Sequence, residues 1–314
     1  MAEPSESVLR AENLTKTFGR REAVTNVSFD VRAGEVFGFL GPNGAGKTTT
    51  IRMLVGLARP DRGSVRIRGL DITRDFERAM AHVGCIVESP DLYRYLTGRE
   101  NLLHFARMLP RGAADRIGEL ASLVALSERL DDRVSTYSLG MRQRLGIAQA
   151  LLGNPDVLIL DEPANGLDPA GIREIRQLVR YLASERGMSV FVSSHLLSEI
   201  ELMCDRVAII HRGRTLATGP VREMLDRVAS DQVRVTARPV SRARALLSEF
   251  GPAEPLASDG GGEGEGVVTA RIPREKVPSA IAALSAAGVD VFSVERPPTS
   301  LEDVFLQITG GETV

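Results

Sequence analysis

Tryptophan is absent from this chain of 314 residues, aromatic side chains make up 4% of it, and two cysteines and three lysines stand beside 36 arginines. Cys85 and Cys204 lie far apart, with no CxxC spacing and no neighbouring pair of histidines. That pattern excludes a disulfide framework or a zinc site of the usual spacing and predicts two reduced, buried thiols. The arginine excess runs along the whole chain and indicates codon usage in a GC-rich genome. Lys16, Lys47 and Lys276 are therefore the exceptions that need a chemical reason.

Long hydrophobic runs are also lacking, since no segment approaches the ~18 apolar residues of a membrane-spanning helix. The first ten residues, MAEPSESVLR, lack the basic start and apolar stretch of a signal peptide, so we expect an intracellular protein without direct membrane insertion. A net charge of -2 and the lack of a lysine-rich tract disfavour a broad nucleic-acid surface, and we expect no nucleic-acid partner. The hydrophobic fraction of 43% and charged fraction of 25% exclude wholesale disorder and a fibrous repeat.

The first 228 residues alternate short apolar runs with helical patterns, which is typical of an α/β domain with a largely parallel sheet. Continuous apolar runs such as VLIL and SVFVSS are those of buried parallel strands. From about residue 90 to residue 152 the patterns are almost all helical, which predicts a helical subdomain on this sheet. The expected strands cover residues 27–31, 35–40, 65–68, 83–87, 157–160, 190–193 and 207–211.

Residues 229–314 differ in composition and predict a small C-terminal α+β domain. Two passes of strand and helix flank the Gly-rich, acidic loop SDGGGEGEG at residues 258–266, and a last helix is expected at residues 300–309. No catalytic constellation is visible in this part. The chemistry is therefore expected in the larger domain, residues 1–228.

The segment GPNGAGKT, residues 41–48, follows an apolar strand and opens a helical pattern, as the strand–GxxxxGK[ST]–helix rule requires. Its glycines let backbone N–H groups converge on phosphate oxygens, and the helix N-terminus adds a positive dipole. Lys47 supplies a point charge for the β- and γ-phosphates, and the Thr48 hydroxyl is a candidate Mg²⁺ ligand. The predicted nucleotide-binding residues of this phosphate-binding loop are Gly41, Pro42, Asn43, Gly44, Ala45, Gly46, Lys47, Thr48 and Thr49.

A second motif, VLILDEP, places Asp161 and Glu162 at the C-terminal end of a buried strand, where open α/β sheets bind their ligands. Asp161 can hold the water shell of Mg²⁺, while Glu162 polarises an attacking water. Caps and turns end many apolar strands with the same residue types. A phosphate-binding loop earlier in the chain favours catalysis, so the two motifs together predict hydrolysis of a nucleoside triphosphate with Mg²⁺.

With these motifs in order, about 220 residues resemble the ATPase subunit of an ABC transporter, a P-loop NTPase fold with a helical subdomain. YSLGMRQRLGIAQAL, residues 137–151, resembles the family's signature segment. Ser138 and Gly140 are retained, whereas Leu139 and Met141 depart from the usual glycine and glutamine. The resemblance implies that Ser138 and Gly140 contact the γ-phosphate of ATP bound to a second copy, and therefore a head-to-tail homodimer.

Three further residues take their roles from this resemblance. NGLDP, residues 165–169, resembles the loop where two subunits meet and implies a nucleotide contact for Asp168. His195 corresponds to the histidine that contacts the γ-phosphate and orients the catalytic glutamate and water. Phe18 stands where an aromatic ring stacks on adenine. We expect its neighbour Lys16 to be a solvated charge.

Glu88 is the main departure from the family pattern, because VGCIVESP aligns with a loop whose family residue is a glutamine that reaches the Mg²⁺ site and senses the membrane subunit. A carboxylate binds Mg²⁺ more strongly than an amide, which makes Glu88 a candidate metal ligand, although it adds negative charge to the site. Together with the following SPDLYRYLTGRENL, it resembles the subgroup that exports bacitracin and lantibiotic peptides. Anthracycline-resistance ATPases are similar over the rest of the chain. A tolerated substitution is the alternative interpretation.

The resemblance implies the ATP-hydrolysing subunit of an exporter, which powers efflux of a drug or peptide antibiotic through a separate membrane-spanning permease. Such a subunit is expected in the cytoplasm, peripheral on the inner face of the cell membrane. The alternative, a soluble ABC-type ATPase not coupled to transport, typically carries two cassettes or a long coiled-coil insertion. This chain has one phosphate-binding loop and neither extension. Its intact catalytic residues argue against a non-hydrolysing switch.

Overall fold

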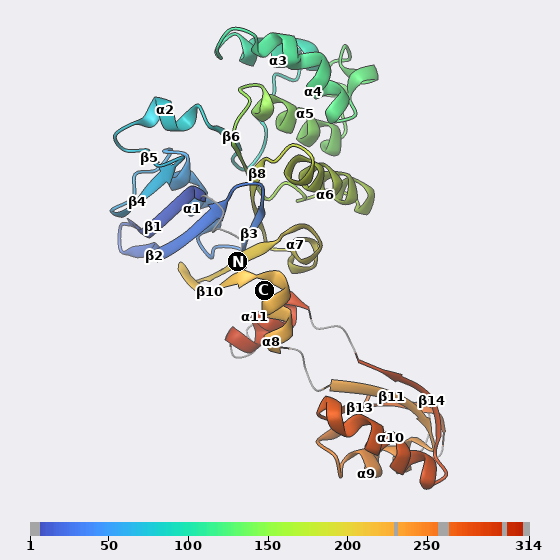
Figure 1. Ribbon diagram of the computed structural model, residues 1–314. Helices are drawn as coiled ribbons and strands as arrows, with labels where there is room; N and C mark the ends of the chain where they lie inside the picture. Colours follow the sequence, from blue (N-terminus) through green and yellow to red (C-terminus); the bar gives the residue numbers. More distant parts are fainter. Residues whose placement is uncertain (1–6, 229–231, 257–263, 297–299, 310–314) are drawn as a thin grey trace. The chain divides into compact units, whose positions relative to one another are not determined.

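The computed structural model describes residues 7–228, 232–256, 264–296 and 300–309 (Figure 1). They divide into two compact units, one made of residues 7–223 with 305–309 and the other of residues 224–304. The sequence predicts a boundary at residue 229. It does not predict that the chain rejoins the first unit at its last helix.

A six-stranded sheet forms the centre of the first unit, in the order β10-β9-β3-β8-β7-β6. All neighbours in it are parallel except β9 and β10, which form an antiparallel hairpin, so the predicted parallel sheet is confirmed. Continuous burial of β3, β7 and β8 explains their uninterrupted apolar sequences. The strands are β3 Val36–Leu40, β6 Val83–Ile86, β7 Val157–Asp161, β8 Ser189–Ser194, β9 Arg206–His211 and β10 Arg214–Pro220.

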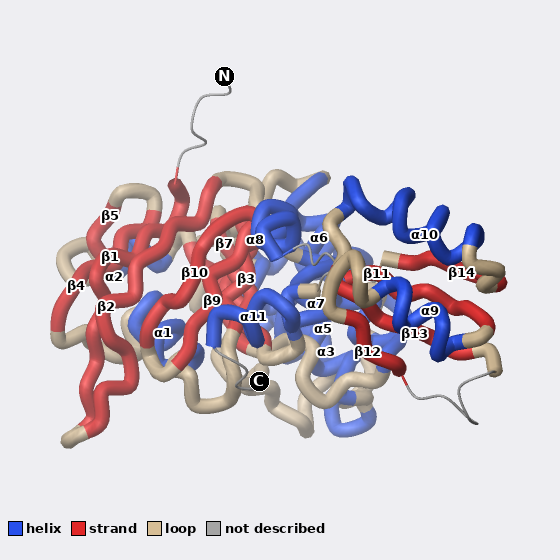
Figure 2. Tube along the Cα trace, turned by 90° about the horizontal axis from the view of Figure 1, so that it is seen from below, coloured by secondary structure: helices blue, strands red, loops and turns tan. Residues whose placement is uncertain are grey.

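A second, antiparallel sheet in the order β2-β1-β4-β5 packs beside it, and α1 (Lys47–Leu54) contacts β1, β2 and β7 between the two sheets (Figure 2). Its strands are β1 Ser7–Phe18, β2 Arg21–Arg32, β4 Arg62–Ile67 and β5 Leu70–Asp71. Four phenylalanines join the sheets: Phe29 of β2 stacks on Phe37 of β3 and Phe191 of β8 with ring centroids 5.5 Å apart, and Phe39 lies 5.3 Å from it. Four of the 14 aromatic residues of the chain therefore lie in this core.

The helical part of the first unit comprises α3 Gly98–Ala106, α4 Ile117–Leu123 and α5 Leu139–Leu151, and it lies to one side of the sheet in Figure 1. Thr97 and Glu100 form a capping box that starts α3. This region falls within the predicted helical subdomain of residues 90–152. The other helices of the unit are α2 Phe76–Met80, α6 Pro169–Ser184, α7 Leu197–Met203 and the start of α8 Val221–Val228.

The second unit is a β-α-β-β-α-β fold with the all-antiparallel strand order β12-β13-β11-β14, the ferredoxin-like arrangement. Helices α9 and α10 cover one face of this sheet (Figure 1), and the predicted α+β class is confirmed. Most of the predicted Gly-rich loop, residues 258–263, lies outside the described residues. The elements are β11 Gln232–Arg238, α9 Val240–Leu247, β12 Ala253–Leu256, β13 Gly266–Arg271, α10 Val277–Ala286 and β14 Asp290–Glu295, and α11 Leu301–Thr309 ends the described chain.

The two cysteines have different surroundings. Cys204 is buried, and this burial raises the pKa of its thiol. Cys85 is exposed, so the expectation of two buried thiols is wrong for it: it lies on β6, the edge strand of the six-stranded sheet. Within the described part of the chain, every helix is too short or too polar to cross a membrane.

Candidate active site

The loop between β3 and α1 has room only for glycine at two of its positions. A Cβ atom on Gly41 would lie 2.2 Å from the carbonyl oxygen of Ile210, and one on Gly46 would lie 2.6 Å from that of Ala23. Gly46 also has a φ of 104°, in the region that favours glycine. The close packing brings the loop into a tight turn at the N-terminus of α1, which is the geometry that binds phosphate through backbone N–H groups.

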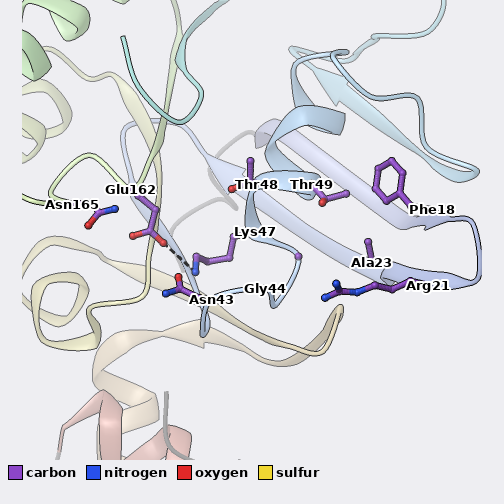
Figure 3. Close-up of a pocket in the computed structure, with 11 residues that line it drawn as sticks. Phe18, Arg21, Ala23, Asn43, Gly44, Lys47, Thr48, Thr49, Glu162 and Asn165 are labelled. Carbon is purple, nitrogen blue, oxygen red and sulfur yellow. Dashed lines mark ion pairs between the residues drawn. The ribbon is translucent and has the colours of Figure 1, made fainter.

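Lys47, the first residue of α1, is buried with 6% of its side chain exposed. Its Nζ atom donates hydrogen bonds to the carbonyl oxygens of Gly41 at 2.7 Å and Pro42 at 3.3 Å. The same atom forms an ion pair with Oε1 of Glu162 at 3.0 Å (Figure 3). The loop and the end of β7 are therefore joined by one buried cation.

Glu162 follows β7 and adopts a left-handed backbone with a φ of 49°. Its Oε2 atom lies 2.7 Å from Nδ1 of His195, and its backbone N–H donates to Ser193 Oγ at 3.0 Å. The carboxylate is thus held between Lys47 and His195. Backbone strain of this kind persists where surrounding contacts determine the conformation, as at many functional sites.

Asp161, the last residue of β7, is 2% exposed. Its Oδ1 atom accepts a hydrogen bond of 2.6 Å from Ser193 Oγ, whereas its buried Oδ2 atom has no partner among the described residues. A buried, unpartnered carboxylate oxygen is costly unless a ligand satisfies it, and oxygen donors are those that Mg²⁺ prefers. The residues present therefore fit the predicted metal.

A cavity of about 390 Å³ opens in front of the loop and contains most of the predicted nucleotide-binding residues (Figure 3). Arg21, Ala23 and Asn165 also line it, and the sequence did not single them out as site residues. Arg21, one of 36 arginines, and Ala23 belong to no recognisable sequence motif. Asn165, in contrast, is the first residue of the NGLDP segment. The predicted residues that line the cavity are Phe18, Asn43, Gly44, Gly46, Lys47, Thr48, Thr49 and Glu162.

Phe18 is 54% exposed at this cavity, so one face of its ring is available for stacking. Lys16 Nζ lies 5.6 Å from the ring centroid and forms an ion pair of 2.9 Å with Asp61. Lys16 is only 17% exposed, so the expectation of a solvated charge is wrong. Its hydrogen bond to Asp61 holds the pKa of that carboxyl below its usual value, together with a bond from the Thr17 N–H.

Gly41, Pro42 and Ala45 belong to the phosphate-binding loop without lining the cavity. The three other predicted nucleotide contacts that do not line it lie on different elements. Ser138 is the N-cap of α5 and accepts a hydrogen bond of 3.2 Å from the Met141 N–H, with Gly140 in the first turn. Asp168 is the N-cap of α6 and accepts a bond of 2.8 Å from the Gly171 N–H. Ser138 and Asp168 are both exposed. Within one chain these residues are not brought to the phosphate-binding loop.

Glu88 lies outside the cavity as well. It has a left-handed backbone with a φ of 67° and forms an ion pair with Arg52 of α1, both side chains being about half exposed at 59% and 47%. Of the predicted metal ligands, only Thr48 lines the cavity, and Asp161 stands at the end of β7 beside Glu162.

A glycine-rich loop at a helix N-terminus, a buried lysine, and a carboxylate held by a histidine are the parts of a P-loop nucleoside triphosphatase. Comparison with known proteins gives the family. The family model described as ABC transporter matches residues 24–165. The chain belongs to the ATP-binding proteins of ABC transporters, and it is an ATPase.

Two relatives and one solved structure illustrate the similarity. The ABC transporter ATP-binding protein YhcH of Bacillus subtilis is 48% identical over 97% of this chain and 96% of its own length. The bacitracin transport ATP-binding protein BcrA of Bacillus licheniformis is 38% identical over 98% of this chain and 99% of its own. An ATP-binding cassette solved as a dimer in a post-hydrolysis state with ADP and Pi is 26% identical, with a TM-score of 0.61, over 68% of this chain and 99% of that one.

Proposed function

We propose that this chain is the ATP-hydrolysing subunit of an exporter that moves a drug or peptide antibiotic out of the cell through a separate membrane subunit. One observation carries this proposal: the similarity to a bacitracin transport ATP-binding protein runs along 98% of the chain, so it includes the second unit and the last helix as well as the ATPase core. We place the subunit on the inner face of the membrane, held there by its partner.

The residues of the cavity have separate roles in binding and hydrolysing ATP. The N–H groups of the loop and Lys47 bind the phosphates, and Phe18 stacks on the base. Thr48 and Asp161 would hold Mg²⁺, which when bound neutralises charge on the phosphate oxygens. Glu162 takes the proton of the attacking water, and His195 orients that carboxylate through the 2.7 Å contact.

The ion pair between Lys47 and Glu162 competes with the phosphates. Lys47 Nζ already has two carbonyl partners and one carboxylate partner. When the γ-phosphate takes the place of Glu162 at Nζ, Oε1 of Glu162 is released to accept a hydrogen bond from water. Occupation of the site by ATP thereby frees the base that the reaction requires.

The exposed positions of Ser138 and Asp168, with the half-buried Gly140 close to Ser138, support a second copy as their target. Each lies at or beside the N-terminus of a helix of more than eight residues, and helix N-termini favour anions. We propose that two chains pair head to tail, so that Ser138 and Gly140 of one chain reach the γ-phosphate held by the other.

The segment after Glu88 is the proposed contact with the membrane subunit. Tyr93 and Tyr95 are 39% and 70% exposed, and Tyr93 packs edge-on against His104 with ring centroids 5.0 Å apart. Exposed aromatic side chains on a rigid cluster are typical anchors of protein interfaces. Because Glu88 pairs with Arg52 and does not line the cavity, we assign it to communication with this partner and not to Mg²⁺.

The function is tested by expressing the chain in a susceptible bacterium together with a membrane permease from the same genome. The minimal inhibitory concentration of bacitracin and related peptide antibiotics is expected to rise with the parental chain and not with Glu162→Gln. Equal susceptibility with both chains across such antibiotics would contradict the export function.

Glu88→Gln is expected to change stimulation of ATP hydrolysis by the membrane subunit while basal hydrolysis stays within about twofold, because an exposed ion pair contributes only about 0–1 kcal/mol. Arg52→Gln breaks the same pair from α1 and should act alike. The measurement is ATPase activity with and without the partner in vesicles. Asp75→Asn, which breaks the exposed pair with Arg78, is the control. Parental stimulation in Glu88→Gln would support the tolerated-substitution interpretation.

A further inference from the structure

The last helix of the chain returns to the ATPase unit after the ferredoxin-like unit is complete. Its residues 305–309 belong to the first unit, and Phe305 is fully buried there. The Phe305 ring meets the ring of His211 edge-on, with centroids 6.0 Å apart and an interplanar angle of 75°. Both Figure 1 and Figure 2 show this part of α11 next to the β9–β10 hairpin. The contact therefore joins the end of the described chain to the last residue of β9.

His211 begins the tight turn between β9 and β10, and that turn packs against the phosphate-binding loop. The Gly213 N–H donates to the carbonyl oxygen of Ala45 at 2.9 Å, and the Gly213 carbonyl oxygen accepts from the Thr25 N–H at 2.7 Å. A Cβ atom on Gly213 would lie 2.7 Å from the carbonyl oxygen of Ala23, a residue that lines the cavity. The turn thus fixes one edge of the nucleotide site by backbone contacts.

The strand that leads into the turn is equally close to the loop. The Ile210 carbonyl oxygen is the atom that excludes any side chain at Gly41, and Gly46 packs with its added Cβ position 3.6 Å from the Gly213 Cα atom. Residues 210–213 therefore contact the loop at its start and its end. A shift of this short segment would move the N–H groups that converge on phosphate.

We propose that Phe305 is a positioning residue for the phosphate-binding loop: by packing on His211 it holds the β9–β10 turn against Ala45 and Gly46. This inference rests on the proposed binding of ATP phosphates by that loop. It also makes the last helix a structural part of the nucleotide site. Because the ferredoxin-like unit is inserted between α8 and α11, both of its ends continue into the ATPase unit.

The effect of Phe305 is on nucleotide affinity and not on the chemical step. The loop that the turn supports holds the phosphates, whereas Glu162 and His195 are positioned by each other and by the ends of β7 and β8. Loss of the ring should therefore raise the KM for ATP about tenfold, equivalent to about 1.4 kcal/mol, with kcat within about twofold. Phe305→Leu keeps most of the apolar volume but loses the ring contact with His211, so it should still raise the KM about threefold.

The test uses the full chain with Phe305→Ala, Phe305→Leu and, as a control on the same helix, Ile308→Ala, whose side chain is 41% exposed. ATP affinity is measured by titration with a fluorescent ATP analogue, and KM and kcat are measured by steady-state hydrolysis. Hydrogen exchange at the backbone amides of residues 43–47 is measured by mass spectrometry. We expect weaker binding and faster exchange at these amides in Phe305→Ala, and parental values in Ile308→Ala.

Two outcomes separate this inference from the proposed function. If the parental chain itself fails to bind ATP, the phosphate-binding assignment is wrong. If the parental chain binds ATP and Phe305→Ala does so equally well, Phe305 has no positioning role, even where its thermal unfolding temperature falls. Should Phe305→Ala be unfolded, Phe305→Leu decides: parental KM and parental exchange at residues 43–47 despite a lowered unfolding temperature would overturn the proposal.

Discussion

Glu162→Gln is expected to reduce steady-state ATP hydrolysis at least about 100-fold while ATP binding is retained. The amide has the size of the carboxylate and can stay between Lys47 and His195, but it cannot take a proton from water. Its loss of charge also removes the ion pair of 3.0 Å that competes with the γ-phosphate for Lys47. Binding should therefore be at least as tight as in the parental chain.

The measurement combines steady-state hydrolysis, nucleotide binding and size-exclusion chromatography with ATP. Because hydrolysis no longer reopens the pair, the variant should elute as a dimer in ATP. Glu185→Gln, an exposed carboxylate at the end of α6, is the matched control and should behave as the parental chain. Hydrolysis by Glu162→Gln near the parental rate would show that another group is the base.

Lys47→Arg is expected to weaken ATP binding about 30-fold or more, although the positive charge is preserved. Nζ is enclosed by two carbonyl oxygens at 2.7 and 3.3 Å and a carboxylate at 3.0 Å, and the side chain is 6% exposed. A planar guanidinium is larger than an ammonium group and needs a different donor geometry. Overpacking of such a site costs about 1–3 kcal/mol, and 2 kcal/mol corresponds to about 30-fold in affinity.

Isothermal titration with ATP checks this expectation, and Lys276→Arg provides the control. Lys276 is exposed beside α10, so its replacement should leave ATP affinity unchanged. In a chain with 36 arginines, a tolerated arginine at position 47 would remove the chemical reason for the lysine there. An ATP affinity of Lys47→Arg within about twofold of the parental value would show that arginine is tolerated at this position.

The sequence predicts those parts of the fold that depend on local pattern. The strands β3, β7 and β8 are buried on both faces, so their apolar runs are continuous and their positions are predicted within a residue or two. The sequence does not predict strand β1, because its apolar residues are interrupted by Glu12 and Asn13, where register shifts and a left-handed residue break the alternation. The sequence does not predict strand β10 either. This strand lies at the edge of the sheet, so its sequence mixes polar and apolar residues and shows no continuous apolar run.

Within the site, motifs identify residues, whereas contacts depend on tertiary structure. The phosphate-binding loop and Glu162 are visible because their spacing is required by the chemistry. The pairing of Lys47 with Glu162, of Glu88 with Arg52 and of Phe305 with His211 joins residues far apart in the chain and leaves no local pattern. Arg21 lines the cavity without any neighbour in the sequence that marks it.

The split course of the first unit has a consequence for biosynthesis. Residues 224–304 are translated between its two parts, so its final segment emerges only after the whole second unit has been made. At roughly 5–20 residues per second this interval lasts about 4 to 16 seconds. During it the nascent ATPase lacks the ring that packs on His211. Its nucleotide site is then completed only on a chain whose synthesis has reached residue 305, which ties ATP binding to the completion of the second unit.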